Sequence, residues 1–246
     1  DHAFPRRGGV LSVRSAPPPR NESANRRVDE PAISRRGHLA FLPPVSPSLL
    51  FLNTSSVMNI CVYCSSSNHI DAVYPEVAQT LGHLLAKREH ALVYGGGNVG
   101  LMGILARTLH EDGGHVIGVI PEKLKAKEGI AYGVADELIV TETMRERKKV
   151  MYTRGDGFAV LPGGYGTLEE FLEVLTLKQL DYHQRPIALI NTNGFFDPLL
   201  GFFDHLYAAQ FARVRPEELI HVASDPADAL DFIEQHATTS PASEAF

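Results

Sequence analysis

Tryptophan is absent from this chain of 246 residues, and cysteine occurs only twice, at positions 61 and 64. Two cysteines cannot build a disulfide scaffold, and a zinc set would need further ligands at a suitable spacing. The 11 histidines form neither an H-x-x-x-H nor an H-E-x-x-H pattern. We therefore expect no metal and no cofactor, and we interpret Cys61 and Cys64 as structural residues.

Lysine is also absent from residues 1–57, which hold eight of the 16 prolines and show no sustained apolar period. Proline removes backbone donors and breaks helices, so this segment cannot bury enough apolar surface to offset its ordering entropy. A strand pattern begins directly after Met58. We expect residues 1–57 to be a disordered or non-native N-terminal extension and residues 58–246 to be one folded domain. The extension has three interpretations: sequence upstream of a natural start at Met58, a disordered arm, or an organelle transit peptide.

No apolar run is long enough to span a bilayer, because the stretch from Leu39 to Leu52 is interrupted by three prolines. Residues 58–246 carry 15 of the 23 Lys and Arg against 25 of the 29 Asp and Glu, a net charge of −10. Such an acidic domain argues against nucleic acid as a partner. We expect a cytoplasmic protein with a small-molecule substrate and no membrane partner.

Short apolar segments alternate with helical patterns after Met58. Strands are expected at residues 58–63, 91–94, 115–120, 137–141, 157–161, 187–191 and 221–223. Helices are expected at residues 74–88, 101–111, 144–152, 167–180, 198–210 and 226–235. This alternation is typical of α/β proteins and predicts a single Rossmann-like domain, a doubly wound parallel sheet with helices on both faces. Ligands bind such folds beyond the carboxyl ends of the strands, where the glycine-rich loops fall.

The first glycine run follows a predicted strand and opens a helix. Its glycines let the backbone approach an anion at a helix N-terminus. The candidates for a phosphate or sugar loop are Gly95, Gly96, Gly97, Gly100 and Met102. The run also matches G-x-G-x-x-G, which leaves two alternatives: a tight turn without a ligand, or an NAD-dependent oxidoreductase with Glu122 as its ribose-binding acid.

The second glycine run, Pro162–Glu170, also leaves a predicted strand and enters a helix. Its backbone N–H groups can wrap a phosphate, and the Thr167 hydroxyl can add a hydrogen bond. Glu170 follows Thr167 at the capping-box spacing, so a purely structural role as a helix cap is the alternative. The only dense basic cluster is Met144–Lys149, which is either a solvated helix face or an anion site.

These motifs together resemble the LONELY GUY family of cytokinin riboside 5′-monophosphate phosphoribohydrolases, once widely labelled lysine decarboxylases. The family motif P-G-G-x-G-T-x-x-E is matched by Pro162–Glu170, and M-x-x-R-K is matched by Met144, Arg147 and Lys148. The openings I-C-V-Y-C-S-S-S and Y-G-G-G-x-x-G-L-M-G are similar to the family as well. The resemblance covers residues 58–223. This chain departs from the family after Thr176, because the family usually has W-A-Q-L-G where this chain has L-K-Q-L-D at residues 177–181.

The resemblance implies a homodimer or higher oligomer that splits a nucleoside 5′-monophosphate, either a cytokinin nucleotide or AMP, into free base and ribose 5-phosphate. It implies that residues 58–246 form a nucleotide-binding α/β hydrolase domain, with Arg147 and Glu170 as the catalytic pair. The residues it implies for substrate binding are Glu128, Arg147, Lys148, Gly163, Gly164, Tyr165, Gly166, Thr167, Leu168, Glu169, Glu170 and Thr176.

Cleavage of an N-glycosidic bond builds positive charge on the ribose, so we assign Glu170 to stabilise that charge and to position water. We assign Arg147 to a contact with the phosphate or the ribose. A non-catalytic nucleotide-binding protein is a further alternative, since glycine loops alone only bind. A pyridoxal-phosphate decarboxylase would need a Schiff-base lysine that nothing in the sequence marks.

Overall fold

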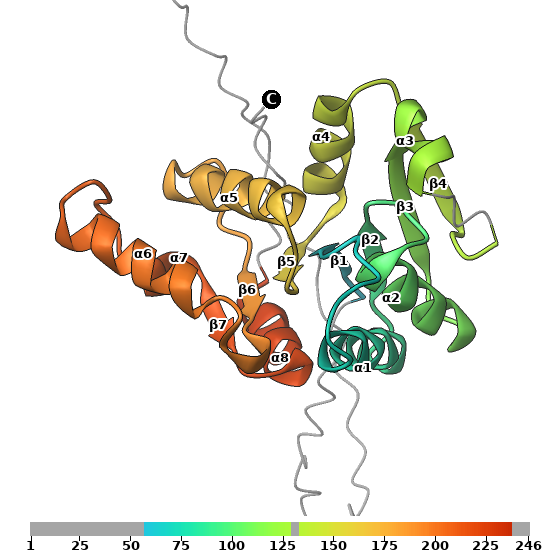
Figure 1. The fold of residues 1–246 in the computed structure, drawn as a ribbon, viewed down its shortest axis with the longest axis horizontal. Coiled ribbons are helices and arrows are strands. Elements are labelled where there is room, and N and C mark those ends of the chain that lie inside the picture. The colour runs from blue at the N-terminus through green and yellow to red at the C-terminus, as the bar shows by residue number, and fades with distance from the viewer. Residues whose placement is uncertain (1–56, 129–132, 238–246) are drawn as a thin grey trace, which may run out of the picture. The chain divides into compact units, whose positions relative to one another are not determined.

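Seven strands form one sheet in the computed structural model, which describes residues 57–128 and 133–237, without the side chains of residues 126–128 (Figure 1). The strands are β1 (Asn59–Tyr63), β2 (Ala91–Tyr94), β3 (Val116–Pro121), β4 (Glu137–Thr141), β5 (Gly157–Val160), β6 (Ile187–Ile190) and β7 (His221–Ala223). Residues 1–56 lie outside the described part of the chain, so the domain boundary at Met58 stays a prediction.

The sheet order is β4-β3-β2-β1-β5-β6-β7, and every neighbouring pair is parallel. The chain builds outward from β1 to β4, then returns to place β5 on the other side of β1. The loops that leave β1 and β5 therefore diverge, and a crevice opens where they part. The predicted doubly wound parallel sheet is confirmed.

Helices cover both faces of the sheet (Figure 1). They are α1 (Val73–Lys87), α2 (Gly100–Glu111), α3 (Glu122–Glu128), α4 (Met144–Arg154), α5 (Tyr165–Gln179), α6 (Asp197–Ala208), α7 (Pro216–Leu219) and α8 (Pro226–His236), with a 3-10 turn at Thr192–Gly194. No helix in the described ranges is long and apolar enough to cross a membrane.

Strand β1 separates two apolar cores, because its successive side chains point to opposite faces. Ile60 and Val62 pack with residues of α1, α2 and α8, whereas Cys61 and Tyr63 pack with residues of α4 and α5. Both cysteines are buried and free, and burial raises the pKa of the Cys61 thiol to about 12. A thiol that stays protonated at neutral pH is unreactive, which agrees with the structural interpretation of the pair.

Two differences from the predicted elements affect the site. Helix α3 was not predicted, because its sequence is dense in charge and has no apolar stripe. Helix α5 begins at Tyr165 rather than Thr167, with Gly164 as its N-cap residue. With Thr167 as the N-cap residue, Glu170 would be the third residue of the helix; with Gly164 as the N-cap residue, it is the sixth.

Candidate active site

A cleft of about 430 Å³ opens at the carboxyl end of the sheet, beside β1 and β5. It is lined by Cys64, Ser65, Ser66, Ser67, Met102, Leu124, Met144, Arg147, Gly164, Tyr165, Gly166, Thr167 and Glu170. Sequence reasoning did not select the three serines or Leu124 as site residues. The serines could have been found by the rule that ligands lie beyond strand ends, since they directly follow β1.

Arg147 is buried beneath this cleft and reaches three protein oxygens. Its Nη1 donates to Glu170 Oε1 at 2.8 Å, its Nε to the Val119 carbonyl at 3.1 Å, and its Nη2 to the Gly95 carbonyl at 3.4 Å. Its neighbours Arg145 and Lys149 are exposed. The basic cluster is therefore a solvated face except at Arg147 and Lys148, and Arg147 is fixed by contacts to β3, to α5 and to the residue that follows β2.

Glu170 is 7% exposed and lines the cleft. Its Oε1 accepts the hydrogen bond from Arg147, whereas its Oε2 receives none from the residues that the structure describes. Burial raises the pKa of this carboxyl, and the charge of Arg147 opposes that rise. The capping-box alternative is wrong, because the helix starts five residues before Glu170 and its N-cap residue Gly164 has no side chain.

The N-terminus of α5 is open toward the cleft. The N–H groups of Tyr165, Gly166 and Thr167 donate to no oxygen in the described part of the chain, as expected for the first turn of a helix without a side-chain cap. All three residues line the cleft, and the Thr167 side chain is buried against it. Free amides and the positive end of the helix dipole make this the place where an anion is best stabilised.

The N-terminus of α2, by contrast, is occupied by the chain itself. The N–H groups of Leu101 and Met102 donate to the Ser65 carbonyl at 2.9 and 3.4 Å, and that of Gly100 donates to Asn68 Oδ1 at 2.8 Å. Gly100 has a positive φ of 59°, and a Cβ there would lie 2.5 Å from the Ser66 carbonyl carbon. The loop after β1 therefore takes the place that the NAD-dependent alternative assigns to a pyrophosphate.

The first glycine run lies behind the residues that line the cleft. Gly95, Gly96 and Gly97 are buried and are not among the lining residues given above, while Gly95 supplies a carbonyl to Arg147. Met102 is the one member of the predicted phosphate or sugar loop that lines the cleft. Contact between these glycines and a substrate stays a prediction.

The remaining predicted residues are spread around the start of α5. Lys148 Nζ donates to Glu169, and to Glu173 Oε1 at 3.1 Å, so it ties α4 to α5 outside the cleft. Leu168 packs on the core, and Gly163 lies beside the cleft, against Thr167. Glu128 is the last residue of α3, and its side chain lies outside the described ones.

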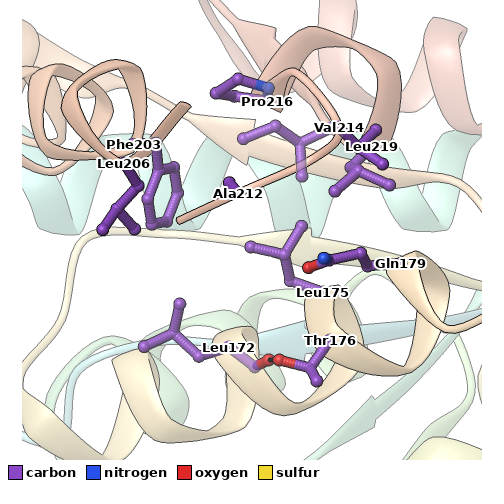
Figure 2. Close-up of a pocket in the computed structure, with 11 residues that line it drawn as sticks. Leu172, Leu175, Thr176, Gln179, Phe203, Leu206, Ala212, Val214, Pro216 and Leu219 are labelled. Atoms are coloured by element: carbon purple, nitrogen blue, oxygen red, sulfur yellow. Dashed lines mark hydrogen bonds between the residues drawn. The ribbon is translucent and has the colours of Figure 1, made fainter. Parts of the chain in front are cut away.

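Thr176 lies away from the cleft. It follows Glu170 by six residues on α5, and its hydroxyl donates to the Leu172 carbonyl at 2.7 Å. Together with Leu172, Leu175 and Gln179 it lines a separate apolar groove of about 180 Å³, whose other wall comes from α6, α7 and the segment between them (Figure 2). Within one chain, Thr176 therefore lines a different surface from the one that the Arg147–Glu170 pair lines.

The fold and cleft define a class: a doubly wound α/β protein with a buried Arg–Glu pair and an open helix N-terminus at the crevice. The molybdenum cofactor carrier protein of Chlamydomonas reinhardtii has a similar fold, with a TM-score of 0.58 and 24% identity over 73% of this chain and 98% of that one. A protein from Rippkaea orientalis, described as a molybdenum cofactor binding protein, is similar at a TM-score of 0.55 and 23% identity over 73% and 97% of the two chains.

Sequence comparison is more specific. The family model described as "possible lysine decarboxylase" matches residues 102–233. The cytokinin riboside 5′-monophosphate phosphoribohydrolase LOG2 of Arabidopsis thaliana is 40% identical over 182 residues, 74% of this chain and 85% of that protein. LOG3 of the same plant is 39% identical over 186 residues, 76% and 86% of the two chains. The chain belongs to the LONELY GUY family of cytokinin riboside 5′-monophosphate phosphoribohydrolases.

Proposed function

We propose that this chain hydrolyses the N-glycosidic bond of a nucleoside 5′-monophosphate, a cytokinin nucleotide or AMP, releasing free base and ribose 5-phosphate. The observation that carries the proposal is the Glu170 carboxylate in the cleft that the open end of α5 also lines. Arg147 holds one of its oxygens at 2.8 Å, and no described residue donates a hydrogen bond to the other. The proposed compartment is the cytosol, which the two free cysteines support.

The helix end and the carboxylate have separate tasks. The phosphate is received by the N–H groups of residues 165–167, where the dipole of α5 favours negative charge. The ribose then lies over Glu170, whose free Oε2 faces the anomeric carbon or the water that attacks it. As the bond to the base breaks, positive charge grows on the ribose, and a fixed carboxylate stabilises it. Arg147 keeps that carboxylate ionised and oriented.

A substrate panel tests this function. Purified protein is incubated with nucleoside 5′-monophosphates and with the matched free nucleosides, and both free base and ribose 5-phosphate are measured. We expect the monophosphates to be cleaved and the nucleosides to react at least about 100-fold more slowly, because the hydrogen bonds from the N–H groups of residues 165–167 to a charged phosphate are lost. Release of no base from any monophosphate would contradict hydrolysis and favour a protein that only binds nucleotides.

We also propose a homodimer or higher oligomer. Large apolar side chains are exposed on α6 and after it, with Phe202 at 54% and Phe211 at 84%, near the groove that α5 shares with α6 and α7. Apolar surface of this kind is costly to leave in water and is typical of subunit interfaces. Light scattering at micromolar concentration should give at least twice the chain mass, and a monomer under those conditions would contradict the proposal.

A further inference from the structure

A second cavity, of about 240 Å³, lies beside the cleft, and we call it the second pocket. Its lining residues are Ser65, Ser67, Ile70, Tyr74, Pro162, Gly163, Gly164 and Phe195. Ser65, Ser67 and Gly164 also line the cleft, so the two cavities meet where the loops after β1 and β5 face each other. The cleft is walled by α2 to α5, whereas the second pocket is walled by α1 and the turn after β6.

The edge that the two cavities share offers hydrogen-bond donors. The N–H groups of Gly163 and Gly164 donate to no oxygen of the described residues. Ser65 Oγ accepts the Ser67 N–H at 3.0 Å, and Ser67 Oγ accepts the His69 N–H at 3.2 Å, so neither hydroxyl hydrogen is donated within the described part of the chain. Gly164 is the N-cap residue of α5, so the positive end of the helix dipole lies here as well. This edge suits a phosphate group beyond the one at the first turn of α5.

The far wall of the second pocket is apolar and aromatic. Tyr74 and Phe195 are in edge-to-face contact, with ring centroids 5.9 Å apart, and Phe195 makes a similar contact at 5.0 Å with the buried Phe196. These contacts fix the Phe195 ring while 41% of the residue stays exposed. Ile70 completes the wall, and none of the lining residues carries a charged side chain. A nucleobase of any kind can stack on such an aromatic ring, because every base has a π face.

We propose that the cleft and the second pocket together bind a dinucleotide, in which two nucleosides are joined through their 5′-phosphates. This inference rests on the proposed function, because one nucleoside lies in the cleft, where its bond to the base is hydrolysed. The second nucleoside lies against Phe195 and Tyr74, and the pyrophosphate spans the start of α5 and the shared edge. The crevice at the switch point of a doubly wound sheet is where dinucleotides bind. Here the phosphates lie at α5, because the loop after β1 occupies the N-terminus of α2.

The bond that breaks is the same as in a monophosphate. The oxygen of water forms a bond to the anomeric carbon, the bond to the base nitrogen breaks with its electron pair passing to the base, and the base gains the proton that water loses. The products are free base and a dinucleotide that has lost one base. A nucleoside diphosphate should be a poorer substrate than a dinucleotide, because its terminal phosphate brings an additional charge to a pocket that has no cation and leaves the aromatic wall uncovered.

The test compares AMP, ADP and diadenosine 5′,5′-pyrophosphate, which is ADP with a second adenosine on its terminal phosphate. For adenine release, we expect kcat/KM of the dinucleotide to exceed that of ADP about 10-fold. In Phe195→Ala the kcat/KM ratio of the dinucleotide to AMP should fall about 10-fold, and this ratio does not depend on the folded fraction. The matched control is Leu180→Ala, an apolar residue that is 59% exposed and lines neither cavity, and its ratio should equal that of the wild type.

Equal kcat/KM values for the dinucleotide and ADP, with AMP cleaved, would overturn the inference and leave the proposed function intact. An advantage of the dinucleotide that survives in Phe195→Ala would overturn it as well. If the wild type released adenine from no substrate, the proposed function would have failed, and equilibrium binding to the wild type would then decide the inference. Binding of the dinucleotide about 10-fold tighter than that of ADP, and lost in Phe195→Ala, would support the second pocket as a nucleoside site, whereas equal binding would overturn it.

Discussion

Glu170→Gln is expected to lower kcat by about 100- to 1,000-fold while the affinity for a nucleoside monophosphate stays close to that of the wild type. Glutamine has the shape of glutamate, and its oxygen can still accept the hydrogen bond from Arg147, but it has no charge to stabilise the developing cation on the ribose. The phosphate contacts at the start of α5 are untouched. Single-turnover rates and equilibrium binding, both measured on the folded fraction, separate the two effects.

Glu173→Gln is the matched control for this variant. Glu173 lies one turn further along α5 and is also paired with a cation of α4, Lys148, at 3.1 Å, but it does not line the cleft. Its substitution should leave kcat near the wild-type value. For Glu170→Gln we expect a stability loss below the roughly 3–5 kcal/mol that deletion of a buried ionic partner costs, because a hydrogen-bond acceptor remains. Near wild-type turnover in Glu170→Gln would move the binding-only alternative to first place.

The raised pKa of Glu170 gives this variant a second readout. Only the ionised carboxylate stabilises the transition state, so wild-type kcat should fall on acidification at a higher pH than an exposed glutamate would impose. The folded state binds this proton more tightly than the unfolded state does. Glu170 therefore contributes no loss of stability as the pH falls through its raised pKa, and lost activity is separable from acid unfolding. Residual turnover in Glu170→Gln should lack this acid limb.

The class of fold was predictable because the strands at the centre of the sheet are short and almost wholly apolar segments between helical patterns. β2, β5 and β6 are four-residue segments in which every residue is buried. Helix α3 was not predicted because most of its residues are charged and give no apolar pattern. Leu124, the residue of this helix that lines the cleft, is a single apolar residue among them. The start of α5 was missed because Gly166 weakens any helical pattern over residues 165–167.

The candidate site was predictable as a set of residues but not as an arrangement. Arg147 and Glu170 are 23 residues apart, and they meet only because β5 returns to the centre of the sheet and brings α5 beside α4. The position of β5 beside β1 depends on pairing between distant segments, which a local sequence pattern does not predict. Thr176 shows the reverse case, because six residues of helix turn it away from the face of Glu170, and helical geometry alone argues against a shared site.

Gly166→Ala is expected to raise thermal stability and to lower kcat/KM by about 100-fold or more. The protein itself does not require glycine here: φ is not positive, and a Cβ would meet no atom within 4 Å. In the first turn of a helix, alanine should stabilise by up to about 1 kcal/mol. The empty space faces the cleft, however, and a methyl group there would keep a phosphate from the amides of α5, each of which contributes about 1.5–3 kcal/mol.

Gly163→Ala is the contrasting variant, since a Cβ there would lie 2.1 Å from Thr167 Oγ1 and 2.6 Å from Thr167 Cβ. It should lose about 1–3 kcal/mol through this overlap, so its activity loss would follow its loss of folded protein. Thermal unfolding and steady-state kinetics on both variants should thus give opposite shifts in melting temperature. Because the Gly166→Ala side chain has room within the chain, a fall in kcat/KM is expected from a ligand bound against the backbone. A more stable Gly166→Ala protein with undiminished kcat/KM would mean that the phosphate does not bind at the start of α5.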